Sequence, residues 1–248
     1  MSVHAILVLR KPDQFSDQLQ SSGFRVINFP VTATRSVDDF GQLNDRIVDI
    51  DRYDGCFFTS PVAAEIFVKA LIAAGRTFTG KIYVLGERAK EVFEKVGIDV
   101  EFRSHANTAG EFIGAFPESE FAGKSYLFVK GEQSMGTVPD MLVDTANVEE
   151  VVVYRTIDLL PETSLVDETR KELLSGRINW VCFFAPSAVE SFLRIFELSE
   201  LSEIKTAAIG VTTALRISDV GLPVNFISKE ASSLRFAAGL IQHIKNIE

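Results

Sequence analysis

The stretch Asn179–Phe192, NWVCFFAPSAVESF, has a second version in this chain, Asp54–Phe67, which reads DGCFFTSPVAAEIF. Aligned at an offset of 125 residues, both carry a Phe before a Pro and then an Ala, a Glu and a Phe. Each is a short apolar run, followed by Pro and by apolar residues at helical spacing. This pattern predicts a buried strand that leads directly into a helix.

Two further pairs of segments repeat in almost the same register. Ile82–Val100 and Thr206–Val224 match at an offset of 124 residues and share two glycine positions. A third pair begins at Thr108 and at Ser232, each followed four residues later by a Phe. Three matches over half of the chain indicate two similar domains that arose by duplication.

Composition restricts the classes of function. The 248 residues suit one large or two ordinary domains, and 46% of them are hydrophobic, enough for two cores. No run approaches the roughly 18 apolar residues of a membrane span, and the first residues lack a secretion-signal pattern, so we expect a cytoplasmic protein. Cys56 and Cys182 fall in the two matching strands and are expected to be core thiols rather than a disulfide.

The net charge of −9 argues against a nucleic-acid partner, since a phosphate backbone needs a basic face. No cluster of Lys and Arg offsets it. An acidic ligand requires that a few bases and backbone amides gather in one place.

Strands and helices are expected to alternate along the chain. The predicted strands are Ala5–Leu9, Arg25–Phe29, Tyr53–Thr59, Lys81–Leu85, Val100–Phe102, Ser125–Val129, Val148–Thr156, Trp180–Phe184, Thr206–Ile209 and Val224–Ile227. Helices are predicted after Pro61, Gly86, Pro186 and Gly210, and at Phe15–Ser22, Phe40–Val48, Thr108–Phe116, Met135–Val143, Leu165–Leu174 and Ser232–Ile244. Nearly continuous apolar strands in such an alternation are typical of open parallel α/β sheets.

The order of these elements suggests how the domains are built. A first β-α-β unit precedes one complete set of elements, and the last set lacks its own beginning. We therefore predict a discontinuous domain, residues 1–33 with 157–248, and an inserted domain, residues 36–153, with linkers near 31–36 and 152–157. Two tandem halves are the alternative.

Ligands of parallel sheets bind beyond the carboxyl ends of the strands, where helix N-termini direct free N–H groups outward. The repeats place four turns there: Thr59-Ser60-Pro61, Gly86-Glu87-Arg88, Ala185-Pro186-Ser187 and Gly210-Val211-Thr212-Thr213. Each hydroxyl either caps its own helix or contributes to one anion-binding site. Arg10 and Lys130 end equivalent strands, and each is either a carboxylate partner or a solvated charge.

Several familiar chemistries have no support in the sequence. The chain contains no GxGxxG, no GxxxxGK[ST] phosphate loop and no GxSxG elbow. Its three histidines are scattered, and no metal-ligand spacing occurs. What remains is a set of hydroxyls, amides and bases, with Tyr154 near the end of its strand.

The chain resembles the uroporphyrinogen-III synthase family over essentially its whole length. The matching pieces are the LVLR-P end of the first strand, YDGCFFTSP, the turn at Gly86, Lys130-Gly131, the VYRT around Tyr154, FFAPSAVESF, AAIGVTTAL with VGLPV, and EASSLRFAAGL. The resemblance implies an α/β protein of two flavodoxin-like domains with parallel sheets, one discontinuous and one inserted, joined by a two-stranded linker.

The resemblance also implies a reaction, a cyclising hydro-lyase step of porphyrin and heme biosynthesis. Hydroxymethylbilane, a linear tetrapyrrole with many carboxylates, would lose water and close with inversion of ring D to give uroporphyrinogen III. The family uses no metal or organic cofactor. Departure of the hydroxymethyl hydroxyl gives an azafulvene cation, and attack by the substituted carbon of ring D gives a spiro intermediate that fragments and recloses. The enzyme's task is mainly positioning and assisting that departure.

Functional residues carry over at matching positions. Tyr154 matches the family's Tyr near the linker, which is the candidate for assisting departure of the hydroxyl; otherwise it is an amphipathic strand-end residue. The substrate-binding candidates are Thr212, Thr213, Ser187, Ser60, Gly86, Gly210, Arg10 and Lys130.

The first repeat departs from the family pattern at two places. Val62 stands where many members carry a polar or basic residue, and Ala89 replaces a Thr common in the glycine turn. Glu87 would repel an acidic substrate there, and Arg88 is the residue that could compensate.

Two other functions stay open from the sequence alone. A non-catalytic two-lobed protein that closes on a small ligand shares this organisation, and a nucleotide-dependent α/β enzyme is a weaker alternative. We expect a monomer, because each repeat has its partner within the chain. Transient contact with hydroxymethylbilane synthase, which supplies the unstable substrate, is a further open question.

Overall fold

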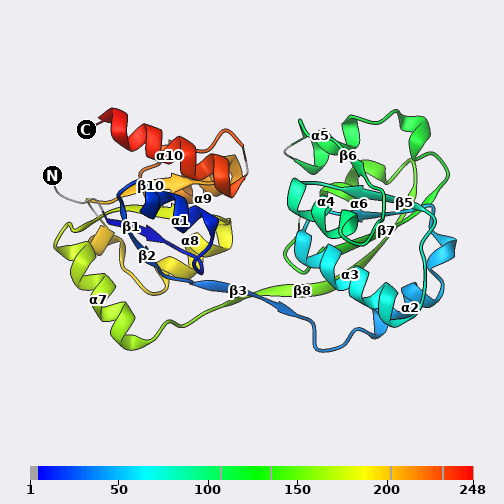
Figure 1. The fold of residues 1–248 in the computed structure, drawn as a ribbon, viewed down its shortest axis with the longest axis horizontal. Helices are drawn as coiled ribbons and strands as arrows, with labels where there is room; N and C mark the ends of the chain where they lie inside the picture. Colours follow the sequence, from blue (N-terminus) through cyan, green and yellow to red (C-terminus); the bar gives the residue numbers. More distant parts are fainter. Residues whose placement is uncertain (1–4, 107, 135, 202, 231, 248) are drawn as a thin grey trace. The chain divides into compact units, whose positions relative to one another are not determined.

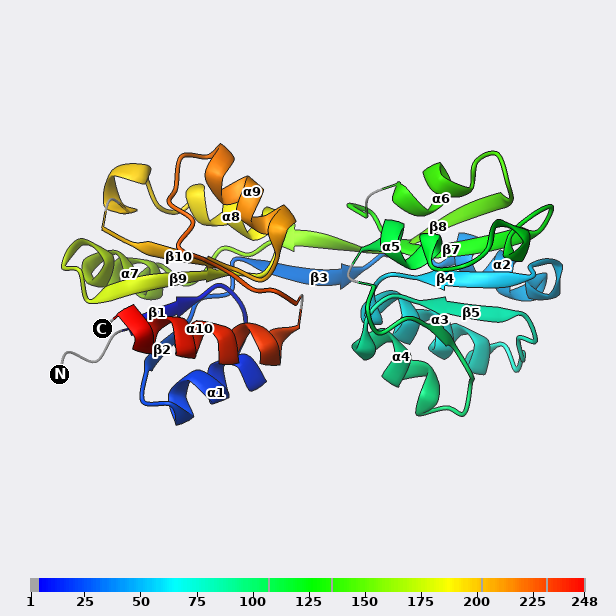
Figure 2. The same ribbon diagram turned by 90° about the horizontal axis from the view of Figure 1, so that it is seen from above.

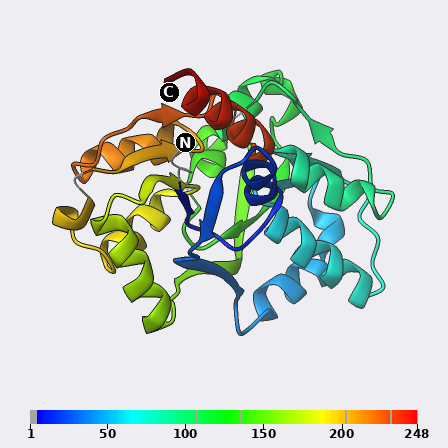
Figure 3. The same cartoon turned by 60° about the vertical axis from the view of Figure 1, so that its left-hand side comes forward.

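A computed structural model of the protein describes residues 5–106, 108–134, 136–201, 203–230 and 232–247. The chain divides into two compact units (Figure 1). Unit 1 comprises Met1–Ala33 and Ile157–Glu248, and unit 2 comprises Thr34–Thr156. The blue segment that begins the chain and the red helix α10 (Ser233–Ile247) that ends it both belong to unit 1 (Figure 3).

The sheet of unit 1 has five strands in the order β11-β10-β9-β1-β2, and its neighbouring strands pair in parallel. The strands are β1 (Ala5–Val8), β2 (Arg25–Asn28), β9 (Ile178–Phe183), β10 (Lys205–Ala208) and β11 (Phe226–Ile227). Numbered along the chain within the unit, the order is 2-1-3-4-5, the flavodoxin-like arrangement.

Helices cover both faces of this sheet (Figure 2). On one face, α1 (Gln14–Ser21) and α10 pack on a cluster that includes Ile6 and Trp180. On the other face lie α7 (Thr163–Leu174), α8 (Pro186–Leu193) and α9 (Val211–Asp219). Because side chains alternate along a strand, the central strands of such a three-layer unit are apolar on both faces, as the sequence predicted; all four residues of β1 are buried.

The sheet of unit 2 has six strands in the order β3-β8-β7-β4-β5-β6. They are β3 (Thr32–Ser36), β4 (Gly55–Phe58), β5 (Lys81–Val84), β6 (Glu101–Phe102), β7 (Ser125–Gly131) and β8 (Asn147–Asp158). When β4, β5 and β6 are matched to β9, β10 and β11, and β7 and β8 to β1 and β2, the two sheets have the same order. Unit 2 is thus a circular permutation of unit 1, with β3 added at one edge.

Helices α2 (Gly41–Val48), α3 (Pro61–Ala73) and α4 (Glu87–Glu94) cover one face of this second sheet. The opposite face carries α5 (Ala109–Gly114) and α6 (Thr137–Leu142) (Figure 2). Three short 3-10 helices that the sequence pattern did not predict lie at Ile50–Arg52, Glu118–Glu120 and Leu198–Leu201.

Several local predictions are confirmed, and some boundaries move. Ser60 caps α3 by accepting a hydrogen bond from the Val62 amide at 3.2 Å. Cys56 and Cys182 are free and buried, and burial raises the pKa of both thiols, so neither is a reactive thiolate. Strand β8 runs on to Asp158, two residues past its predicted end, and α6 is shorter than predicted; Met135 of that prediction lies outside the described residues.

Candidate functional site at the carboxyl edges of the sheets

The predicted site residues fall into two groups, each at the carboxyl edge of one sheet. In unit 1, pairing of Val8 with Cys182 and of Ala208 with Phe183 aligns the ends of β1, β9 and β10. The residues just beyond those ends are Arg10, Ser187, Gly210, Thr212 and Thr213. In unit 2, Phe58 pairs with both Val84 and Val129, which aligns the ends of β4, β5 and β7. Ser60, Gly86, Lys130 and Tyr154 lie there.

Tyr154 owes its position to an irregularity in the pairing of β7 with β8. Lys130 pairs with Val152, but the next residue, Gly131, pairs with Tyr154, so Val153 is an extra residue in β8. Such β-bulges change the direction of a strand and occur frequently beside active sites. Tyr154 is half-buried, packs against the core beneath α3 and α4, and its backbone carbonyl accepts a hydrogen bond from the Glu132 amide at 2.9 Å.

The described residues form no hydrogen bond with the phenol hydroxyl of the half-buried Tyr154. Buried tyrosine hydroxyls are normally paired, so a half-buried hydroxyl of this kind is available to solvent or to a ligand. A neutral phenol there can donate a proton or a hydrogen bond to a leaving hydroxyl.

Both candidate cations already have carboxylate partners. The ammonium of Lys130 lies 2.6 Å from Glu150 Oε1, and the Lys130 side chain is only 12% exposed. Arg10 Nη2 lies 3.0 Å from Asp13 Oδ2, and its Nη1 donates to Ser233 Oγ at 3.1 Å. The Arg10 guanidinium also stacks on the Phe184 ring, 4.4 Å from its centroid. These bases are held in place, and a substrate carboxylate would have to exchange with an internal one.

The two threonines of the α9 turn face different surroundings. Thr212 is exposed, whereas Thr213 is 3% exposed and lies on the helix face that carries the buried Ala214 and Ile217. Only Thr212 can offer its hydroxyl to a ligand; Thr213 can offer only its backbone N–H in the first turn. Gly210 is in an extended conformation that any residue adopts.

Ser187 and Gly86 lie at the starts of α8 and α4. Ser187 is half-buried in the first turn of α8, and its carbonyl accepts a hydrogen bond from Ser191 Oγ at 2.9 Å. Gly86 has φ +91°, a left-handed conformation, and a Cβ there would meet no atom within 4 Å. Gly86 therefore allows the backbone conformation of the turn, and it has no side chain that would cover the N-terminus of α4.

The structure clarifies the departures of the first repeat. Ala89 is 1% exposed and occupies the position equivalent to the buried Thr213, so the missing hydroxyl faces a core. Glu87 is exposed and forms an ion pair with Lys90 at 3.6 Å, which reduces the repulsion of an anion by its carboxylate. Val62 is half-buried, and its amide is taken by Ser60.

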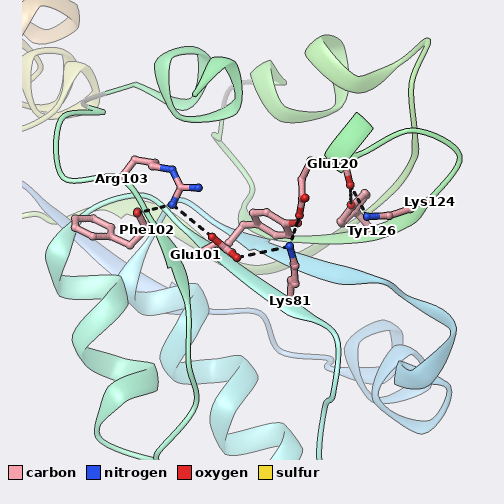
Figure 4. Close-up of polar contacts among 8 residues, drawn as sticks. Lys81, Glu101, Phe102, Arg103, Glu120, Lys124 and Tyr126 are labelled. Carbon is pink, nitrogen blue, oxygen red and sulfur yellow. Dashed lines mark hydrogen bonds and ion pairs between the residues drawn. The ribbon is translucent and has the colours of Figure 1, made fainter. Parts of the chain in front are cut away.

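A group of tyrosines with raised pKa values lies at the opposite edge of unit 2, where the strands begin; Figure 4 shows Tyr126 with its polar neighbours there. Burial raises the pKa of Tyr83 far above its ordinary range and that of Tyr126 to about 12. Glu120 Oε1 accepts hydrogen bonds from Lys81 Nζ at 2.5 Å and Tyr83 Oη at 2.6 Å. Perturbed groups mark functional sites or closed structural networks; here each group is already paired with another, which favours the structural role.

The sequence did not identify the internal partners of the site. Asp13 lies three residues from Arg10, a spacing that could have been noticed, whereas Glu150 reaches Lys130 across the β7–β8 pair. Among the described residues, no group of three or more His, Cys, Asp or Glu could hold a metal ion. Within the same ranges, no helix combines the length and the apolar character needed to cross a membrane.

Comparisons with known proteins agree with this geometry. The family model described as uroporphyrinogen-III synthase HemD matches residues 13–235. The uroporphyrinogen-III synthase of Chlorobaculum parvum is 25% identical, over 97% of this chain and 99% of the relative. That of Schizosaccharomyces pombe is 24% identical, over 92% and 91%.

Solved structures with the same fold carry the same name. A mutant uroporphyrinogen III synthase from Thermus thermophilus superposes with a TM-score of 0.68 at 16% identity, over 98% of this chain and 99% of that one. The Helicobacter pylori uroporphyrinogen-III synthetase gives a TM-score of 0.64 at 18% identity, over 97% and 99%. Since the family model covers most of the chain, the protein belongs to the uroporphyrinogen-III synthase family.

Proposed function

We propose that this protein converts hydroxymethylbilane to uroporphyrinogen III, and that Tyr154 assists departure of the hydroxyl group. The observation that carries the assignment of Tyr154 is its phenol hydroxyl, which has no internal partner among the described residues and lies at the carboxyl edge of a parallel sheet.

The reaction requires two things of the protein: a correctly placed acid and a fixed conformation of the bound substrate. Tyr154 Oη donates to the departing hydroxyl, which leaves as water and creates the azafulvene cation. The substituted carbon of ring D attacks, the spiro intermediate fragments, and the final ring closure releases one proton. The proton taken up by the leaving water is thus returned, and the reaction needs no external oxidant or reductant.

Recognition of the carboxylates is assigned to the two carboxyl edges. Backbone amides at the starts of the helices and the hydroxyls of Ser60, Ser187 and Thr212 are suitable donors. Gly86, Gly210 and the buried Thr213 contribute backbone N–H groups only. Arg10 and Lys130 exchange Asp13 and Glu150 for substrate carboxylates, so each cation stays paired and the displaced carboxylates turn to solvent.

A coupled assay tests the proposal. Hydroxymethylbilane is generated in place from porphobilinogen, the protein is added, and the oxidised products are separated as type I and type III uroporphyrin. We expect type III product in proportion to enzyme. Only type I, the product of spontaneous closure, would contradict catalysis; tetrapyrrole binding without conversion would favour a two-lobed binding protein instead.

The functional unit is proposed to be a single chain in the cytoplasm. Light scattering at several concentrations should give the mass of one chain, 27.4 kDa. A concentration-dependent increase would contradict a monomer. Mixing with hydroxymethylbilane synthase in the same experiment tests for a complex that channels the unstable substrate.

A further inference from the structure

Gly131, the last residue of β7, lies directly beneath the ring of Tyr154. A Cβ atom at position 131 would be 2.5 Å from Tyr154 Cζ, 2.6 Å from Cε2 and 2.8 Å from the phenol oxygen. Non-bonded carbon atoms normally stay about 3.5–4.0 Å apart. No side chain fits at this position while the phenol ring stays where it is.

The backbone of Gly131 gives no other reason for a glycine. Gly131 is the buried last residue of β7 and is not among the glycines with positive φ. Alanine can adopt the same backbone conformation without strain. The requirement for a bare Cα therefore comes from the ring above it.

The opposite strand explains why the ring lies there. The extra residue Val153 brings Tyr154 opposite Gly131, and Val151, Val153 and Tyr154 all contact the core beneath α3 and α4. A regular strand would direct Val153 and Tyr154 to opposite faces. The bulge directs both to the same face, so the phenol ring lies across the end of β7.

Hydrogen bonds fix both strands at this point. The Glu132 amide donates to the Tyr154 carbonyl at 2.9 Å, and the Ser134 amide donates to the Gly131 carbonyl at 3.0 Å. With the backbones held on both sides, the ring cannot move with Gly131, and an added methyl group must displace it.

We propose that Gly131 is a positioning residue for Tyr154: its bare Cα and the β-bulge opposite it set the orientation of the phenol ring and hence the place of its hydroxyl. The proposal rests on the proposed role of that hydroxyl in the reaction. It assigns Gly131 no contact with the substrate.

The test is a double-mutant cycle with Gly131→Ala and Tyr154→Phe. In the wild-type background, Gly131→Ala should lower kcat for type III product by up to about 100-fold, since a shift of about 1 Å of a catalytic group costs that much. KM should change little. In the Tyr154→Phe background, which keeps the ring but lacks the hydroxyl, Gly131→Ala should lower kcat no further. An equal loss in both backgrounds would overturn the proposal.

A structural readout accompanies the kinetics. The chain has four tyrosines, so labelling with tyrosine carrying ¹³C at Cζ gives few NMR signals, which single Tyr→Phe variants assign. Gly131→Ala should shift the Tyr154 signal alone. An unchanged Tyr154 signal with a reduced kcat would overturn positioning. If Gly131→Ala fails to fold, Tyr154→Ala should restore folding by removing the ring, and continued failure would overturn the steric account.

Gly55→Ala is the matched control. Gly55 begins β4, and its Cβ would be 2.9 Å from the rings of Tyr83 and Tyr126, at the opposite edge of the same sheet. Gly55→Ala should lower stability without changing kcat per folded molecule.

Wild-type turnover by Tyr154→Phe would contradict the role of the hydroxyl in the reaction, and the positioning role of Gly131 with it. The positioning role of Gly131 can be contradicted separately: Tyr154→Phe would then be slow, while Gly131→Ala would turn over at the wild-type rate.

Discussion

The two edges of the unit 2 sheet use the same kinds of residue in different ways. At the amino edge, Gly55 lies against the rings of Tyr83 and Tyr126, and Lys81 pairs with Glu120 at 2.5 Å. At the carboxyl edge, Gly131 lies against the ring of Tyr154, and Lys130 pairs with Glu150 at 2.6 Å. Each edge therefore has a glycine beneath a tyrosine ring and a Lys–Glu pair nearby.

The difference lies in the hydroxyl groups. At the amino edge, Tyr83 Oη donates a hydrogen bond to the Glu120 carboxylate. Tyr126 Oη donates to the Glu120 carbonyl at 3.1 Å (Figure 4). The network is closed, and such buried networks stabilise a fold without leaving a group for chemistry. At the carboxyl edge, the Tyr154 hydroxyl lacks a partner in the described part of the chain. A partly open arrangement of the same residue types is what a catalytic site requires.

We expect the largest loss of stability when a methyl group is added at Gly55, at the amino edge. Gly55→Ala would place a Cβ 2.8 Å from the Lys81 carbonyl and against two rings. Overpacking of this kind costs about 3 kcal/mol of unfolding free energy when backbone is involved. All four tyrosines lie in unit 2 and the single Trp180 lies in unit 1, so tyrosine and tryptophan signals in urea unfolding follow the two units separately.

The tyrosine transition should move while kcat per folded molecule stays constant. Gly114→Ala is the control, because a Cβ there meets no atom within 4 Å. If Gly55→Ala lowers kcat while unit 2 remains folded, the amino edge contributes to the reaction, and the distinction between a structural and a catalytic edge is wrong.

A smaller stability loss is expected from Tyr83→Phe. The variant removes the hydrogen bond to the Glu120 carboxylate, and bonds to charged groups contribute about 1.5 kcal/mol or more. Turnover should not change. Equal stability of variant and wild type in tyrosine-monitored unfolding would show that the network is not structural.

Acid should weaken the same network. Hydrogen bonds from Lys81 and Tyr83 hold the pKa of Glu120 below its ordinary value of 4.5, so the folded protein binds fewer protons there than the unfolded chain. The stability that Glu120 contributes is present above about pH 4.5 and is lost as pH falls through its lower folded pKa. Glu120→Gln should be less stable near neutral pH and lose less stability on acidification. An identical pH dependence for variant and wild type would contradict this assignment.

The smallest effect is expected at the Lys–Glu pair of the carboxyl edge. If Lys130 exchanges Glu150 for a substrate carboxylate, Lys130→Met should raise KM roughly fivefold, equivalent to roughly 1 kcal/mol, with kcat unchanged. Lys81→Met, the matching change at the amino edge, should lower stability and leave KM alone. A raised KM in Lys81→Met, together with an unchanged KM and a loss of stability in Lys130→Met, would contradict this assignment of the two pairs.

Much of the fold could be predicted because it depends on periodic signals. Repeated apolar runs, a Pro at helix starts and the glycine turns gave the strands, their order along the chain and the carboxyl edges where Ser60 and Gly86 lie. The burial of Thr213 was also within reach, since Ile217, four residues on, places it on the apolar side of α9.

The contacts that define the site depend on register and could not be predicted in this way. A single extra residue in β8 brings Tyr154 over Gly131, and no periodicity shows which residue of a β-branched run is extra. The pairing of Lys130 with Glu150 joins residues of neighbouring strands and likewise needs the register. Sequence motifs placed these residues at an edge, and the structure gives them their partners.

The measurement that tests the account most directly is the rate of type III product formation by Tyr154→Phe, with its tyrosine-monitored unfolding. Because the hydroxyl has no partner within the described ranges, its removal should leave the unfolding transition unchanged. Loss of an acid catalyst should lower the rate by about 100-fold or more, and type I product should then dominate. Type III formation at the wild-type rate would contradict the assignment of the chemistry to the carboxyl edge of unit 2.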